Sequence, residues 1–138
     1  MKFTAPTKAK EIKRQWHLVD VSGQILGRIS TGIARLLIGK SNPFYVPYLD
    51  CGDYVIVVNA SKVEVTGRKA KTKTYEKYSG YPGGRKLKLF EQLKQENPQR
   101  IIIEAVSGML PKNKLRDSML KRLYVFPDEK HPYGEKFK

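Results

Sequence analysis

The stretch YVIVVNA (residues 54–60) decides the fold class of this chain. It holds four β-branched residues in a row, Val55 to Val58, and no charge interrupts them. Such a run is typical of a strand that is buried on both faces, as in the interior of a parallel sheet. We therefore interpret residues 54–60 as a central strand and work outward from it.

The sequence before this strand predicts a second strand and a helix. WHLVDV (residues 16–21) has the composition of a strand, and residues 23–40 repeat apolar side chains at helical spacing up to Gly39, a typical C-cap residue. Strand, helix and strand in this order predict a right-handed βαβ unit and an α/β fold. The apolar stripe comprises Leu26, Ile29, Ile33, Leu36 and Leu37, with Arg28 and Arg35 on the opposite, solvent-side face.

The sequence after residue 60 predicts a basic excursion, three helices and a strand. Residues 62–88 carry nine cations and two acids and predict an irregular or hairpin-like excursion, and residues 87–96 predict a short helix. Asn97 and Pro98 are suited to the N-cap and first position of another helix, which ends at GMLP (residues 108–111). We expect a basic amphipathic helix over 112–123 and a short strand over 124–126.

The chain length of 138 residues fits a single domain. We expect a basic extension at 1–14, a core at 15–126 and a C-terminal tail at 127–138. The opening sequence lacks the apolar stretch of a signal peptide, and no apolar run reaches the ~20 residues that span a bilayer. A cytoplasmic location is therefore expected.

The charge balance predicts a polyanionic partner. Lys and Arg number 27 against 13 Asp and Glu, which gives a formal net charge of +14 at pH 7. A soluble domain gains no stability from this self-repulsion, so nucleic acid is the best-fitting partner. An acidic membrane surface ranks second and an acidic protein third.

Phosphate-binding signatures of enzymes are missing from the glycine-rich stretches. GQILGR (residues 23–28) lies between a predicted strand and helix, yet it lacks the G-x-G-x-x-G spacing of a dinucleotide site and favours a plain turn. SGYPGGRK (residues 79–86) lacks the pattern of a P-loop. We expect no catalysis and no cofactor.

The polar residues around position 51 give no metal site either. Cys51, His17 and His131 are too few and too scattered for zinc, and a lone Cys51 is typical of a small buried thiol. Asp50 and Asp53 form a conceivable carboxylate pair, but acids that precede a buried strand more often cap backbone groups.

Three separate basic segments, residues 1–14, 62–88 and 112–122, predict a broad contact with nucleic acid. Tyrosines lie among the cations of the second segment, where they can stack on bases or pack the hairpin against the body. No helix-turn-helix, zinc finger or basic zipper is visible, so folded RNA suits these loops better than duplex DNA. The candidate RNA-binding residues are Lys8, Lys10, Lys13, Arg14, Arg28, Arg35, Lys40, Arg68, Lys69, Lys71, Lys73, Tyr75, Tyr78, Tyr81, Gly83, Gly84, Arg85, Lys86, Lys112, Asn113, Lys114, Arg116, Lys121, Arg122 and His131.

Several segments together resemble one family, the bacterial-type L13 proteins of the large ribosomal subunit. They occur in the family's order: GQILGR, YVPYLDCGDYVIVVNA, KVEVTGRK, SGYPGGRK, AVSGMLPKNKL, LKRLYVF and HPY. The resemblance covers roughly residues 16–133. This chain has Tyr78 where the family commonly has His, and HPY where the family often has HPH.

The resemblance implies a three-layer α/β/α body around a small, mainly parallel sheet. It also implies a ribosome-bound structural protein that binds large-subunit (23S-type) rRNA and neighbouring ribosomal proteins, supports early subunit assembly and translation, and does not form homo-oligomers. On this basis SGYPGGRK is a rigid turn against the RNA backbone, and Lys112, Asn113 and Lys114 present donors at a helix start. Two alternatives stay open: a small α/β enzyme acting on RNA or nucleotides, and a regulatory RNA-binding protein acting away from the ribosome.

Overall fold

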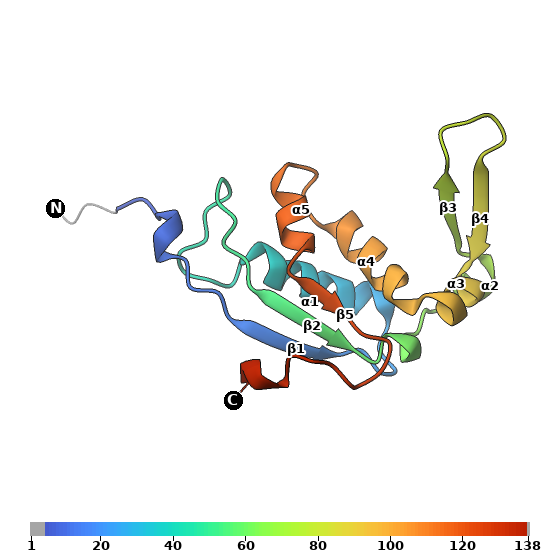
Figure 1. Ribbon diagram of the computed structural model, residues 1–138, viewed down its shortest axis with the longest axis horizontal. Helices are drawn as coiled ribbons and strands as arrows, with labels where there is room; N and C mark the ends of the chain where they lie inside the picture. Colours follow the sequence, from blue (N-terminus) through green and yellow to red (C-terminus); the bar gives the residue numbers. More distant parts are fainter. Residues whose placement is uncertain (1–4, 138) are drawn as a thin grey trace.

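A three-stranded parallel sheet forms the centre of the computed structural model, which describes residues 5–137. The strands are β1 (Trp16–Asp20), β2 (Tyr54–Val58) and β5 (Leu123–Val125), in the order β1-β2-β5 (Figure 1). The central position of β2 and the mixed α/β class confirm the interpretation of the uncharged run. Because β2 has a neighbour on each side, its β-branched residues are shielded along both edges.

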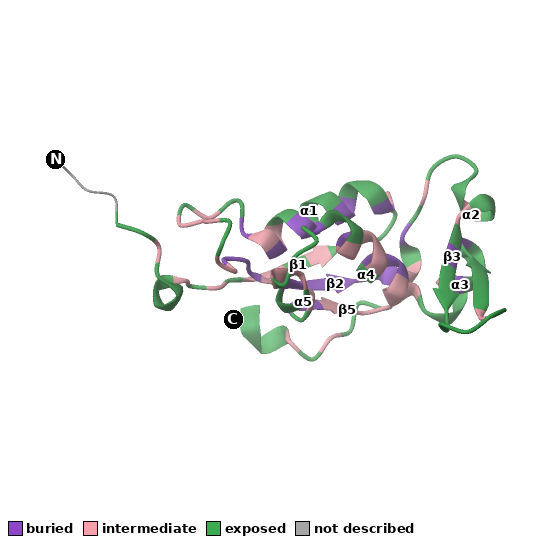
Figure 2. Ribbon diagram, turned by 90° about the horizontal axis from the view of Figure 1, so that it is seen from above, coloured by how far each residue is buried: buried purple, intermediate pink, exposed green. Residues whose placement is uncertain are grey.

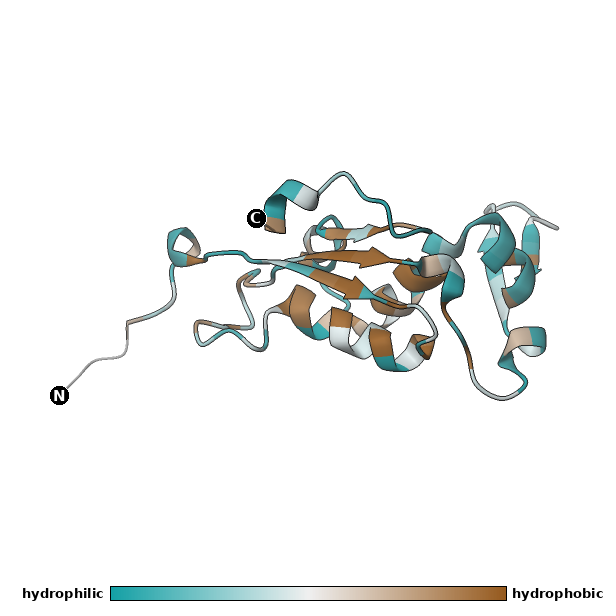
Figure 3. Ribbon diagram, turned by 90° about the horizontal axis from the view of Figure 1, so that it is seen from below, coloured by the Kyte–Doolittle hydropathy of each residue, from teal (hydrophilic) through white to brown (hydrophobic). Residues whose placement is uncertain are grey.

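Two helices, α1 (Leu26–Ile38) and α4 (Pro98–Met109), cover one face of the sheet (Figure 2). Val55 and Val57 point to this face and join the apolar side of α1 in one hydrophobic core. Figure 3 shows the apolar residues of α1 gathered on its sheet side. Gly39 ends α1 in the left-handed region at φ +80°, as expected for the C-cap.

The opposite face of the sheet carries an aromatic layer instead of a long helix. Trp16 stacks on Tyr54 with ring centroids 4.3 Å apart, and Tyr133 of the C-terminal segment stacks on Trp16 at 5.5 Å. The segment continues into the 3-10 helix η3 (Gly134–Phe137). The helical layers on the two faces are therefore unequal, since α1 and α4 cover one and the C-terminal segment with η3 the other.

The β3–β4 hairpin, formed by β3 (Thr74–Tyr78) and β4 (Arg85–Leu89), projects from the body (Figure 1). It confirms the hairpin-like excursion, which also contains a short helix α2 (Lys69–Thr72). The next helix, α3 (Phe90–Glu96), begins three residues later than predicted because residues 87–89 pair with β3.

The predicted helix over 112–123 is wrong at both ends. The helix α5 spans only Leu115–Leu120, because residues 111–114 form a turn and Leu123 already starts β5. Strand β5 accordingly lies one residue earlier than predicted. At the preceding boundary the prediction is confirmed, since the side chain of Asn97 accepts a hydrogen bond from the backbone N–H of Arg100 at 3.3 Å.

The described part of the N-terminal segment lies along the connection between α1 and β2. The Thr7 hydroxyl donates to the Phe44 carbonyl at 3.1 Å, and the 3-10 helix η1 (Ala9–Glu11) follows. A further 3-10 helix, η2 (Ala60–Lys62), follows β2. Residues 1–4 of the predicted extension lie outside the described residues. Within residues 5–137, no helix is long and apolar enough to cross a membrane.

Candidate nucleic-acid interface

The turn of the β3–β4 hairpin is built by its glycines. Gly80 and Gly83 adopt φ of +88° and +74°, a backbone conformation that residues other than glycine rarely adopt. A Cβ on Gly84 would lie 1.8 Å from the Ser79 hydroxyl oxygen, and the backbone N–H of Ser79 donates to the Gly84 carbonyl at 3.2 Å. The sequence SGYPGG therefore specifies one compact turn at the end of the arm.

Two lysines on this hairpin directly oppose each other. Lys77 of β3 pairs in register with Lys86 of β4, and both are exposed. Neither forms an ion pair within the described residues, whereas Arg85 Nε lies 2.9 Å from Glu76 Oε1 and Lys88 pairs with Glu96. The hairpin thus presents two uncompensated charges side by side. Lys77 is not among the RNA-binding residues predicted from the sequence, although the alternation of side chains along a strand places it on one face and could have identified it.

Only two of the three candidate tyrosines are accessible. Tyr78 is 61% exposed and Tyr81 is 75% exposed, so both rings can stack on a base. Tyr75 is 8% exposed and its hydroxyl has no hydrogen-bond partner, which removes this ring from any stacking role. Burial, with the negative charge of Glu104 nearby, raises the pKa of Tyr75 to about 12.

The outer face of α1 brings Arg28, Arg35 and the adjacent Lys40 to the surface. None of the three forms an ion pair within residues 5–137. Arg35 and Lys40 line a hollow of about 600 Å³ that ends at Met109 of α4. This arrangement confirms that the two arginines share the solvent-side face.

The turn directly before α5 holds another basic group, with Lys114 at the N-cap position, but residues 112–114 do not form the first helical turn as predicted. Lys112 and Lys114 are exposed, while the Asn113 side chain accepts a hydrogen bond from the Leu115 backbone N–H at 3.1 Å. The carboxamide oxygen of Asn113 is therefore occupied by the first residue of α5. Arg116 is half-buried and Lys121 is exposed.

Arg122, predicted to contact RNA, is buried and its guanidinium is engaged within the protein. Its side chain forks onto the carboxylate of Asp50, with Nη2 2.6 Å from Oδ1. It also donates to the carbonyls of Leu37 at 3.1 Å and Asp53 at 3.3 Å. At 6% exposure, Arg122 cannot meet a phosphate, so the prediction for this residue is wrong.

Arg14 is half-buried and joins the same network. Its guanidinium donates to the carbonyls of Asp50, at 3.0 Å, and Gly52. Asp53 accepts the Gln15 backbone N–H at 3.1 Å and faces His17 Nε2 at 2.9 Å. The Asp50 carboxylate thus holds the arginines, and the Asp53 carboxylate caps a backbone N–H and faces His17, so both are engaged in holding the fold together.

The remaining candidates are spread over the surface. Lys8, Lys10 and Lys13 are exposed on the N-terminal segment, and Arg68, Lys69 and Lys71 are exposed at the foot of the hairpin beside half-buried Lys73. His131 is half-buried and accepts the Tyr133 backbone N–H at 3.3 Å. Among residues 5–137 no group of three His, Cys, Asp or Glu side chains is placed to hold a metal ion.

The comparisons with known proteins agree with the resemblance found in the sequence. The family model described as Ribosomal protein L13 matches residues 14–132. The chain is 47% identical to the large ribosomal subunit protein uL13 of Nitratiruptor sp. over 138 residues, which cover 100% of this chain and 99% of that protein. It is 50% identical to uL13 of Prochlorococcus marinus over 97% of this chain and 94% of that protein. It is 49% identical to uL13 of Thermotoga maritima over 94% of this chain and 87% of that protein. On this match, which spans nearly the whole chain, the protein belongs to the ribosomal protein L13 family.

Proposed function

We propose that this chain is a structural constituent of the large ribosomal subunit that binds 23S-type rRNA directly and supports early subunit assembly. Its partners are that rRNA and neighbouring ribosomal proteins, and its place is on the ribosome. The observation that carries the proposal is the opposed pair Lys77 and Lys86 on the projecting hairpin.

Like charges directly opposite each other destabilise an antiparallel pair of strands. The hairpin has only two strands and little core of its own, since Tyr75 is its one buried strand residue. A charge arrangement that weakens so small an element is explained by a polyanion that compensates both lysines. The exposed rings of Tyr78 and Tyr81 beside them suit unpaired bases, which RNA offers more often than duplex DNA.

Membership in a ribosomal-protein family identifies the chain as a structural protein and not an enzyme, as expected from the sequence. The relatives are named as proteins of the large ribosomal subunit, which supports assigning this chain to that particle. The regulatory RNA-binding protein remains the alternative, because it requires the same basic surface.

Sedimentation of a cell lysate through a sucrose gradient distinguishes these two roles. We expect the protein to migrate with the large subunit and to remain there after a high-salt wash. Migration as a free small protein, or release at modest salt, would contradict the proposal and favour the regulatory role.

Binding to purified large-subunit rRNA tests the hairpin itself. In the double variant Lys77→Ala/Lys86→Ala we expect weaker binding and a salt dependence reduced by about 0.7–0.9 per lost contact in log–log slope. The matched control, Lys94→Ala/Lys130→Ala, removes the same charge from residues outside the candidate set. Equal effects of both variants would show that only net charge matters and would remove the hairpin from the interface.

A further inference from the structure

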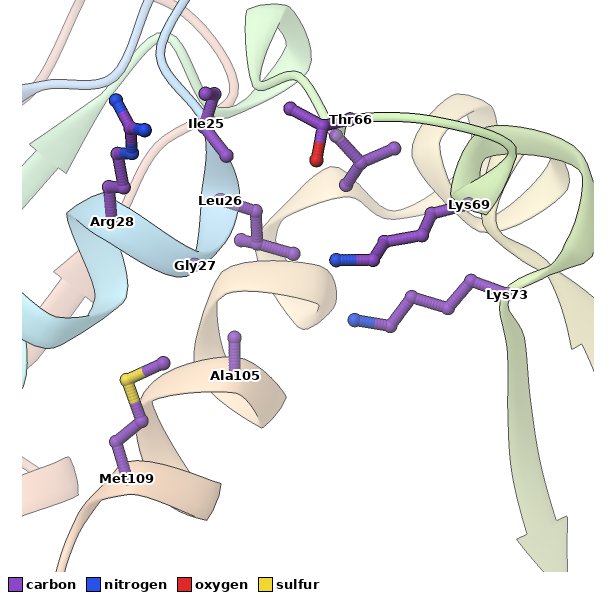
Figure 4. A pocket seen from close by; sticks show the side chains of 10 residues that line it. Ile25, Leu26, Gly27, Arg28, Thr66, Lys69, Lys73, Ala105 and Met109 are labelled. Carbon is purple, nitrogen blue, oxygen red and sulfur yellow. The ribbon is translucent and has the colours of Figure 1, made fainter.

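A cleft opens where the start of α1, the foot of the hairpin and the C-terminal half of α4 meet. Its volume is about 330 Å³. Leu26, Val65, Ala105 and Met109 give it apolar walls. Figure 4 shows Ala105 and Met109 rising from α4 on one side and Leu26 facing them from α1. The cleft is within the size range of small-ligand sites, whose walls are mostly apolar with a few polar groups.

Two lysines at the foot of the hairpin, Lys69 and Lys73, also line the cleft. The side chains of Lys69 and Lys73 both extend toward Leu26, and Arg28 stands at the rim of α1 (Figure 4). None of these three cations forms an ion pair among residues 5–137, and no acidic side chain lines the cleft. Within the described residues the positive charge at the cleft is therefore balanced by no carboxylate, and its only aromatic partner there is the Tyr75 ring, whose centroid lies 5.4 Å from Lys73 Nζ.

The first turn of α1 adds a backbone donor at the same place. The N-cap residue Ile25 has no side-chain oxygen, and the first turn contains no acid. The Leu26 N–H donates to the Glu64 carbonyl at 2.8 Å, but the Gly27 N–H has no acceptor within the described structure. An open helix N-terminus favours an anion, and here it lies beside two lysines.

Gly27 is not required by the fold at this position. A Cβ there would meet no atom within 4 Å, and its backbone is not in the left-handed region. Glycine inside a helix is less stable than alanine, so its presence weakens the first turn without relieving any internal clash. A missing side chain beside a free N–H instead allows close approach of a ligand to the backbone.

We propose that this cleft binds one unpaired nucleotide of the RNA, with the base against Leu26, Ala105 and Met109 and its phosphate against Lys69, Lys73 and the Gly27 N–H. The inference rests on the proposed function and deepens it by naming the RNA feature that the cleft recognises. A phosphate matches the unpaired cations, and a base matches the apolar walls. A basic peptide from a neighbouring protein matches the apolar walls but not the cations of the cleft.

Ultraviolet crosslinking of the protein to purified large-subunit rRNA, followed by mass spectrometry and reverse-transcription mapping, tests the site. We expect a crosslink from a peptide of the cleft, containing Ala105 or Met109, to one nucleotide. Chemical probing should find that nucleotide unpaired in free RNA and protected in the complex. A crosslinked nucleotide inside a duplex would overturn the proposal.

Filling the cleft tests the same claim by affinity. Ala105→Phe adds a ring to the apolar wall, and we expect about tenfold weaker rRNA binding with an unchanged salt slope, because base contacts are lost and phosphate contacts kept. The control is Ile103→Phe on the same helix, where the native side chain is 39% exposed and lies outside the cleft. Met109→Trp is the second filling variant, and thermal melting confirms that each variant is folded.

Three outcomes distinguish failure of the proposed function from failure of the cleft assignment. Failure of the unchanged protein to bind rRNA contradicts the proposed function itself. Normal rRNA affinity and normal nucleotide protection in folded Ala105→Phe and Met109→Trp overturn the cleft assignment alone. Saturable binding of free 5′-mononucleotides that rRNA does not displace would also overturn it, because the ligand would then be a free nucleotide.

Discussion

The guanidinium of Arg122 forms an ion pair with the carboxylate of Asp50, which lies 72 residues away in sequence, and both side chains are largely buried. The pair joins the end of α5 to the connection before β2. Arg122 also reaches carbonyls at the end of α1 and at the start of β2, so three elements converge on one cation.

Replacing Arg122 with Ala should destabilise the protein by about 3–5 kcal/mol, because it leaves the largely buried Asp50 carboxylate with only the more distant Arg14 guanidinium at 3.7 Å. Urea unfolding measures the loss. The double variant Arg122→Met/Asp50→Leu should recover part of it, since both charges are then absent. An Arg122→Ala protein that is as stable as the native one but binds rRNA less well would show Arg122 to be a surface contact.

Gly52 and Gly32 should respond oppositely to alanine. A Cβ on Gly52 would lie 1.6 Å from the Leu37 carbonyl oxygen, whereas one on Gly32 would meet nothing within 4 Å. Gly52→Ala is therefore expected to prevent stable folding, and Gly32→Ala to stabilise α1 by up to about 1 kcal/mol. Thermal melting of both proteins checks this, and a similar melting temperature for the two would contradict the close packing at Gly52.

Lys77→Glu should separate stability from binding. The new carboxylate opposes Lys86, so the hairpin gains roughly 0.2–1 kcal/mol from an opposite-charge pair. Binding to rRNA should weaken at the same time, because a phosphate contact is replaced by repulsion. Hydrogen exchange of the hairpin amides and filter binding give the two readings. Weaker protection together with unchanged binding would contradict the proposed role of this pair.

Tyr75→Phe should stabilise the protein at neutral pH by about 1 kcal/mol, because it removes a buried hydroxyl that has no partner. The pKa of Tyr75, raised to about 12 in the fold from its ordinary value of 10.0, adds a pH dependence. The folded state holds this proton more tightly, so the contribution of Tyr75 to stability is complete below pH 10 and lost as pH rises toward 12. Denaturant unfolding from pH 9 to 12 should fall more steeply for the native protein than for the variant. Parallel curves would show that the Tyr75 hydroxyl is not buried.

Elements with strong local signals were predictable from the sequence. Short stretches of sequence predict three such elements: the uncharged run predicts β2, the apolar period ending at Gly39 predicts α1, and Asn97 before Pro98 predicts the start of α4. The start of α3 was not predictable in this way, because Leu87 and Leu89 suit a helix and join a strand only through pairing with β3. Long-range pairing overrides local preference there.

Whether a basic side chain is exposed or buried depends on tertiary packing. Lys121 and Arg122 are adjacent in a basic run, yet one is exposed and the other is 6% exposed. Sequence alone does not set this orientation, but one signal was present. Asp50 and Asp53 precede a buried strand in a chain with few acids, and buried carboxylates require cations. For the same reason the sequence left open whether Tyr75 stacks on a base or packs the hairpin against the body, and the structure shows it buried.

The central position of β2 has a consequence for synthesis of the chain. Its second neighbour, β5, and the aromatic segment that covers the far face are translated long after β2 itself. At about 5–20 residues per second, the roughly 70 residues between Ile56 and β5 take some 3–14 s to make. During that interval β2 has one open edge, its far face lacks the aromatic segment, and its near face lacks α4 until residues 98–109 are made. Until Leu123–Val125 are made, the newborn chain is thus open to aggregation at this edge, and pairing of β2 with β5 is what ends that exposure.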